Sequence, residues 1–201
     1  QNFGWLLLGT ACAAVLLNAG PIAANILASE SDADAVTRFG YGVLLARVPL
    51  FMFQAIQASL LPRLARLAAQ QSFHEFRRGL RLLVVVVAGM GIIGTIVAGA
   101  LGPWVLELVY GADLSGRTLA MLALSSDLYM MAIAVSQAVL ALEDHAYVAL
   151  GWVIAVLAFI SGTWFSSTEL FRRIEIGLVF SSLAAVIVFA LRLRQRLSRL
   201  A

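Results

Sequence analysis

Two ionisable residues, Arg47 and Asp127, lie inside long apolar stretches of the sequence. Arg47 comes eight residues after Phe39 and Asp127 comes nine residues after Thr118, where these two stretches begin. If the stretches cross a bilayer, each such group costs roughly 2.5–3.5 kcal/mol and usually faces a cavity or a partner. One hypothesis is therefore a structural ion pair between two helices. The other is a cavity in which Arg47 binds an anionic group such as phosphate, which its planar fork of donors suits, while Asp127 holds or titrates against it.

Amide side chains recur at helical spacing in these two stretches and in the first apolar stretch: Asn18 and Asn25, Gln54 and Gln57, and Gln137. Residues seven apart share one face of a helix, which places Asn18 with Asn25 and Arg47 with Gln54. Three helices that each carry a polar stripe predict a shared polar cleft. The alternative for each amide is a hydrogen bond that joins two neighbouring helices.

Two prolines, Pro21 and Pro49, lie inside apolar stretches beside these polar residues. A proline has no backbone N–H, so it opens a helix at the carbonyl four residues earlier, which here means Leu17 and Leu45. Interrupted helices next to polar side chains are typical of transporter binding sites. A kink that serves helix packing alone is the alternative.

Three glycines, Gly89, Gly91 and Gly94, match the spacing of a dinucleotide-binding loop. That loop needs a strand before it and a helix after it, whereas these glycines lie within an apolar stretch without charges. We interpret them as points of close helix packing. Gly94, Ala98 and Gly102 also form a row of small residues along which a neighbouring helix can approach.

No combination of residues in the sequence predicts catalysis or a metal site. His74 and Glu75 begin a zinc-protease motif, but the residue three positions after Glu75 is Arg78, so the second histidine ligand is missing. His145 has acidic neighbours and no second His or Cys nearby, which favours a solvated loop residue. We expect no enzyme activity, no cofactor and no metal ion.

The composition is that of a membrane protein. Of the 201 residues 62% are apolar and 12% are charged, and the mean hydropathy is +0.94. Soluble domains have about 45–50% apolar and about 25% charged residues, so the composition excludes that class, and it excludes intrinsic disorder as well.

The sequence predicts an all-α integral membrane protein with six transmembrane helices. A helix needs about 20 apolar residues to cross a bilayer, and alternation typical of barrel strands is absent. We expect one membrane domain over residues 1–201, with spans at about residues 3–28, 39–61, 82–101, 118–142, 146–165 and 176–191. Because residue 1 is Gln and no charged region precedes the first stretch, we expect a mature or excised piece without a signal peptide.

All 14 basic residues are arginines, and all of them except Arg47 cluster between or after the apolar stretches. With six spans, nine arginines fall on the side of the two termini and four on the other, which predicts that both termini are cytoplasmic. Such clustering indicates membrane orientation and not a nucleic-acid partner. Residues 62–81 alternate Arg with apolar residues, which predicts either a cytoplasmic surface helix on anionic headgroups or a solvated linker helix.

Several segments resemble the polysaccharide-biosynthesis flippases of the multidrug/oligosaccharidyl-lipid/polysaccharide exporter superfamily. The resemblance rests on packing and turn patterns at residues 17–21 (LNAGP), 45–51 (LARVPLF), 58–64 (ASLLPRL), 102–104 (GPW) and 109–111 (VYG). It covers the first four spans well and the last two mainly by hydropathy.

The resemblance implies one lobe of a two-lobed transporter, closest to the second, C-terminal lobe. It implies lipid-linked oligosaccharide as substrate, a bacterial plasma membrane as location, and a position for Arg47 where it meets a pyrophosphate. A second six-helix lobe would be needed, either from the same chain in a longer protein or from a dimer mate.

Two other functions remain open at this point. A cation-coupled drug exporter of the same superfamily would use Asp127 as its coupling site, with Arg47 only as its partner. A scaffold that transports nothing would instead recruit glycan-assembly enzymes through its basic cytoplasmic face.

Overall fold

The computed structural model describes residues 2–199, without the side chains of residues 2, 55–56 and 58–61. Within this range every regular element is a helix and no strand is present, which confirms the expected all-helical fold. The elements in chain order are α1 (Asn2–Leu27), the short 3-10 helix η1 (Glu30–Asp32), α2 (Ala33–Ala46), α3 (Val48–Ala69), α4 (Phe73–Tyr110), α5 (Gly116–Ala141), α6 (His145–Phe165) and α7 (Leu170–Arg199).

Among the described residues, six helical segments are long and apolar enough to cross a membrane, as the sequence predicts. Five of them are α1, α4, α5, α6 and α7, and the remaining one runs from Glu30 through α2 into α3 and ends at Gln54. Helices satisfy their own backbone hydrogen bonds, which is the condition for crossing lipid. The chain is therefore built as a multi-pass membrane protein.

Two helices extend beyond the expected spans, and the second membrane segment lies at Glu30–Gln54, where residues 39–61 were expected. α4 begins at Phe73 and ends at Tyr110, where residues 82–101 were expected, and α7 covers Leu170–Arg199 in place of residues 176–191. The expected boundaries follow the apolar residues only, whereas the added residues include Arg, Leu and Glu, which are good helix formers and continue a helix past the apolar region. Pro62 and Pro103, which follow the ends of the expected spans 39–61 and 82–101, lie inside α3 and α4.

The connection at residues 62–81 is neither the separate surface helix nor the separate linker helix that the sequence predicts as alternatives. α3 continues to Ala69, and α4 begins at Phe73 after a tight turn. In this turn Gln71 has a left-handed backbone (φ 57°), its N–H bonds to the carbonyl of Ala68 at 3.0 Å, and the N–H of Ser72 bonds to that of Leu67 at 3.0 Å. This pair of bonds is the Schellman pattern that ends a helix, so the chain reverses here directly.

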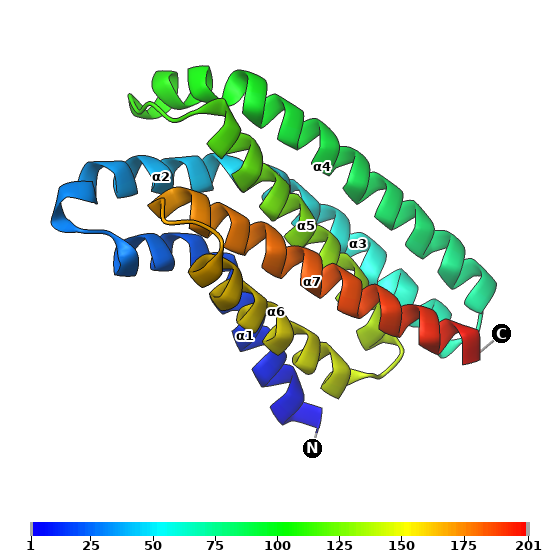
Figure 1. Cartoon of the computed structure of the whole chain (residues 1–201). Coiled ribbons are helices and arrows are strands. Elements are labelled where there is room, and N and C mark those ends of the chain that lie inside the picture. Colours follow the sequence, from blue (N-terminus) through cyan, green and yellow to red (C-terminus); the bar gives the residue numbers. More distant parts are fainter. Residues whose placement is uncertain (1, 200–201) are drawn as a thin grey trace.

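α5 is the central helix of the bundle, with α4 packed against one part of it and α7 against another. α6 packs on α7, α1 packs on α6, and α2 and α3 lie against α4 and α5 (Figure 1). A chain of aromatic contacts joins three helices in the core: the ring centroids of Tyr129 and Trp152 are 5.5 Å apart and those of Trp152 and Phe189 are 5.2 Å apart. Rings at these separations attract each other beyond the effect of their burial.

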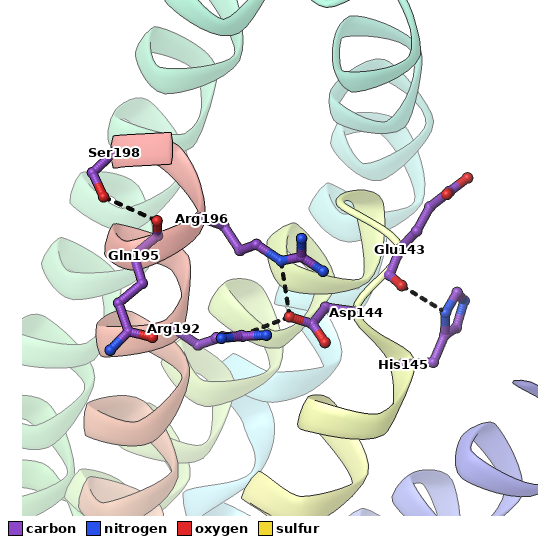
Figure 2. A network of polar contacts seen from close by, with 7 residues as sticks. All are labelled: Glu143, Asp144, His145, Arg192, Gln195, Arg196 and Ser198. Carbon is purple, nitrogen blue, oxygen red and sulfur yellow. Dashed lines mark hydrogen bonds and ion pairs between the residues drawn. The ribbon is translucent and has the colours of Figure 1, made fainter. Parts of the chain in front are cut away.

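The start of α1 and the end of α7 lie at the same end of the bundle as the α3–α4 and α5–α6 turns (Figure 1). The α5–α6 turn is tied to α7 at this end. Arg192 and Arg196 both donate to one carboxylate oxygen of Asp144, at 2.6 Å and 3.0 Å (Figure 2). Burial alone would raise the pKa of Asp144, but the hydrogen bonds and charges of the two arginines outweigh it and hold that pKa below its usual range.

Candidate functional site

Arg47 occupies the break between α2 and α3. α2 ends at Ala46 and α3 begins at Val48, with Pro49 in the first turn of α3. A proline is well tolerated in the first turn of a helix because the N–H it lacks has no helical partner there. The second apolar segment thus consists of two helices, with an arginine at their junction.

The guanidinium of Arg47 donates a hydrogen bond to the carbonyl oxygen of Leu17 in α1. Pro21 lies four residues after Leu17 and has no N–H, so this carbonyl lacks its normal helical donor. The arginine of one interrupted segment therefore satisfies the carbonyl that the proline of the other leaves open. Figure 1 shows that α1 changes direction along its length.

A small cavity of about 40 Å³ lies beside Arg47, between α1, α2, α3, α5 and α7. Its polar lining consists of Arg47, Ser125, Ser126, Tyr129 and Ser182. A volume of this size holds one or a few water molecules, which these few polar groups can bind. The half-buried guanidinium consequently lies at a small cavity whose lining residues, apart from these polar ones, are apolar.

Tyr129 also lines a second cavity of about 240 Å³, to whose lining Gln57 and Gln137 belong. The phenol of Tyr129 lines both cavities and donates to the carbonyl of Ala13 at 2.8 Å. Thr10 and Ser136 add further polar groups to the second cavity. Two of the five expected amides therefore meet around one cavity, next to that of Arg47.

The other three amides lie on the surface of the bundle. Asn18, Asn25 and Gln54 are exposed. The side-chain amides of Asn18 and Asn25 donate back to carbonyls of α1 itself, Ala14 at 3.0 Å and Pro21 at 2.8 Å. Asn18 and Asn25 thus lie on one face of α1, as their spacing predicts, but this face points away from the interior of the bundle.

Asp127 points away from Arg47. It is 7% exposed, accepts a hydrogen bond from the Thr95 hydroxyl at 2.8 Å, and lies against Gly91 of α4. Within residues 2–199 no salt bridge joins Asp127 to Arg47. Successive residues of a helix turn by about 100°, so Asp127 lies about 200° round α5 from Tyr129, which faces the cavity of Arg47.

The sequence does not predict several polar residues that lie in the interior of the bundle. Ser125, Ser126, Tyr129 and Ser182 are ordinary residues of apolar helices, and their small or amphipathic side chains carry no strong signal. Glu175 is 1% exposed, and Arg117 lies 3.5 Å from its carboxylate. Its position one residue before the expected last span made it a loop residue, whereas α7 begins five residues earlier, at Leu170.

The described residues contain no group of three or more His, Cys, Asp or Glu side chains that could hold a metal ion. The chemistry available around Arg47 is hydrogen bonding and charge: one guanidinium, one phenol and several hydroxyls. These groups can bind and orient an anion.

Curated relatives of the chain come from Mycobacterium tuberculosis. Uncharacterized protein Rv1510 (strain H37Rv) is 32% identical over 119 residues, which cover 58% of this chain and 26% of that protein. Uncharacterized protein MT1558/MT1560 (strain CDC 1551) matches with the same identity and coverage. The match thus spans about a quarter of the length of these relatives. No protein-family model and no solved structure matches the chain.

Proposed function

We propose that the chain is one lobe of a flippase that moves lipid-linked oligosaccharide precursors across a bacterial plasma membrane by alternating access. The observation that carries the proposal is the placement of Arg47 at the junction of two half-helices, beside a small cavity that hydroxyl groups also line and in contact with a carbonyl that Pro21 leaves open. The proposed orientation has both termini in the cytoplasm, because the arginine-rich ends of α3 and α4 lie at the same end of the bundle as the start of α1 and the end of α7.

The guanidinium of Arg47 suits the pyrophosphate of such a substrate. A guanidinium has five N–H donors. In the part of the chain that the structure describes, the guanidinium of Arg47 donates to one acceptor, the carbonyl oxygen of Leu17. The remaining donors fit the paired oxygens of a phosphate. No carboxylate within residues 2–199 neutralises the charge.

The exposed amides of α1 and α3 support a second lobe. Asn18, Asn25 and Gln54 lie on the surface of the bundle, and polar side chains are costly against lipid. A water-filled path between this lobe and a second one, in the same protein or in a dimer mate, would solvate these amides. In this arrangement they form the wall along which the sugar portion moves.

The proposal is tested by reconstitution into proteoliposomes with a fluorescent sugar linked to undecaprenyl pyrophosphate in the outer leaflet. Translocation is measured as protection of the fluorophore from a quencher that does not cross the membrane. We expect Arg47→Gln to abolish translocation while the protein still folds. Arg38→Gln removes the same charge from an exposed position in α2 and should leave translocation unchanged. Wild-type translocation by Arg47→Gln would refute the proposal.

The structure also offers a reason to test a cation-coupled exporter as the second candidate. Asp127 is buried, and within the described residues its Oδ1 atom has no hydrogen-bond partner. A carboxylate of this kind is a candidate for binding or releasing a cation. Drug transport that a proton or sodium gradient stimulates, that Asp127→Asn abolishes and that Asp113→Asn in the exposed α4–α5 loop preserves would favour this candidate.

A further inference from the structure

The ends of α3 and α4 that meet at the tight turn enclose a crevice of about 720 Å³. Three arginines from the two helices line it: Arg63 from α3, and Arg78 and Arg81 from α4. Its apolar part includes Leu64, Leu82 and Val85. The volume falls within the range of pockets that hold small molecules, about 300–1,000 Å³.

Polarity changes in one direction along the α4 wall of this crevice. Glu75 lies nearest to the turn, Arg78 and Arg81 follow, and Leu82 and Val85 come last. The two apolar side chains are 59% and 61% exposed, and they belong to the apolar part of α4 that can cross a membrane. The wall therefore passes from charged to apolar within about three turns, the order in which a phospholipid passes from headgroup to acyl chain.

The positive charge of the crevice is not neutralised by the protein. The salt bridges of the described residues involve Arg117, Arg192 and Arg196, and none involves the three crevice arginines. Glu75 is the one acidic residue of the lining. Three positive charges against one negative charge leave an excess that attracts an anion.

The floor of the crevice is held in place by close packing. Leu64 is 2% exposed, and a Cβ atom added at Gly79 would lie 3.3 Å from its Cδ2 atom. Gly79 therefore lets α3 approach α4 closely, and the hydrogen-bonded turn at Gln71 fixes the angle between the two helices. The packed ends of α3 and α4 therefore hold the backbone positions of the three arginines fixed around the crevice.

We propose that this crevice is a binding site for an anionic phospholipid of the surrounding membrane. The phosphate lies among Arg63, Arg78 and Arg81, and an acyl chain lies against Leu82 and Val85. Basic pockets between helices at the membrane surface are suited to such headgroups. The site does not depend on the function proposed above, because none of its residues lines the cavities of Arg47 and Gln57.

The test is native mass spectrometry of the purified chain in detergent, titrated with phosphatidylglycerol or with phosphatidylcholine of the same acyl chains. We expect phosphatidylglycerol to bind more tightly than phosphatidylcholine. The triple variant Arg63→Gln, Arg78→Gln and Arg81→Gln should lose roughly a hundredfold of the phosphatidylglycerol affinity, because each of the three arginines near an anionic group contributes about 1 kcal/mol and about 1.4 kcal/mol corresponds to tenfold. Binding of phosphatidylcholine should not change.

The matched control is Arg66→Gln, Arg194→Gln and Arg199→Gln, which removes the same charge from exposed positions outside the crevice. An equal loss in both triple variants would mean diffuse attraction and would overturn the proposal. Displacement of the lipid by an equal concentration of glycerol phosphate would overturn it too, in favour of a site for a small free anion. If the triple variant does not fold, the single change Arg78→Glu at an exposed position must lower phosphatidylglycerol binding for the proposal to stand.

Discussion

Arg47 and Leu17 are thirty residues apart in the chain, and the guanidinium of Arg47 donates to the carbonyl oxygen of Leu17. Each group would be costly alone inside a membrane, the arginine for its charge and the carbonyl for the donor that Pro21 does not supply. Their contact joins the interrupted α1 to the junction of α2 and α3. This contact makes the two helix breaks a single structural feature.

This relationship predicts coupling between Arg47 and Pro21 in stability. Arg47→Met leaves the Leu17 carbonyl unpaired, which costs about 1–3 kcal/mol of unfolding free energy. With Pro21→Ala, the new N–H of residue 21 bonds to that carbonyl, so the cost of Arg47→Met should fall by roughly 1 kcal/mol or more. The measurement is a double-mutant cycle of unfolding in detergent.

The control for this cycle is Pro103→Ala, a proline inside α4 that does not contact the Arg47 site. It should leave the cost of Arg47→Met unchanged. Equal costs of Arg47→Met with Pro21 and with Ala at position 21 would show that the Leu17 carbonyl does not depend on the arginine.

A second prediction concerns two glycines of α4 that are two residues apart. A Cβ atom at Gly91 would lie 2.9 Å from the Cβ atom of Asp127, whereas one at Gly89 would meet nothing within 4 Å. Gly91→Ala should therefore lower the unfolding free energy by about 1–3 kcal/mol, the usual cost of overpacking. Gly89→Ala should cause no loss, since alanine favours the helix. The measurement is the thermal unfolding midpoint of each variant. Equal midpoints would contradict the close approach of α4 to α5.

The hydroxyl of Thr95 should matter for stability because it donates to the buried carboxylate of Asp127 at 2.8 Å. Thr95→Val keeps the shape and removes the donor, so we expect a loss of about 1–3 kcal/mol. Thr95→Ser keeps the donor and serves as the control. A loss in the serine variant as large as in the valine variant would assign the effect to packing and not to the hydrogen bond.

The six spans could be predicted from the sequence because the length of an apolar stretch is a local property. Neither the neighbour that each polar residue meets nor the extent of each helix is local. By the expected spans, which start at Phe39 and Thr118, Arg47 and Asp127 lie at matching depths, roughly 12–14 Å from the first residue at about 1.5 Å per residue. In the structure the second segment already begins at Glu30. The sequence cannot show that Asp127 faces Gly91 of α4 while Arg47 faces α1, since this depends on how α5 is rotated in the bundle.

For the same reason, only some of the residues expected at the candidate site lie together in the structure. Gln57 and Gln137 line one cavity. Asn18 and Asn25 lie on the face of α1 that forms part of the outer surface of the bundle. A helical stripe is readable from spacing, whereas the direction in which the stripe points depends on the neighbours of that helix. The sequence does not predict the ion pairs of Asp144, because its two arginine partners lie 48 and 52 residues further along the chain.

The contact of Asp144 with Arg192 and Arg196 predicts how stability depends on pH. Although burial acts to raise it, the pKa of Asp144 is held below its usual range by the two arginines. A carboxyl with a lowered pKa in the folded state contributes stability that is fully present above its unfolded pKa, about 3.9, and is lost as pH falls through the folded value. The wild-type protein should therefore lose stability below about pH 4. Asp144→Asn should lower the unfolding free energy at pH 7 by roughly 1–2 kcal/mol, since solvent partly screens the pair.

The pH dependence separates this contact from a general acid effect. Asp144→Asn has no carboxylate to protonate here, so its unfolding midpoint should fall less steeply than that of the wild type between pH 5 and pH 3, a window set by the usual aspartate pKa of about 3.9. Glu143→Gln removes one negative charge at the neighbouring exposed position and should keep the wild-type slope. Thermal unfolding of the three proteins in detergent across this range provides the measurement. Parallel curves for the wild type and Asp144→Asn would mean that the arginines of α7 hold the α5–α6 turn without help from the charge of Asp144.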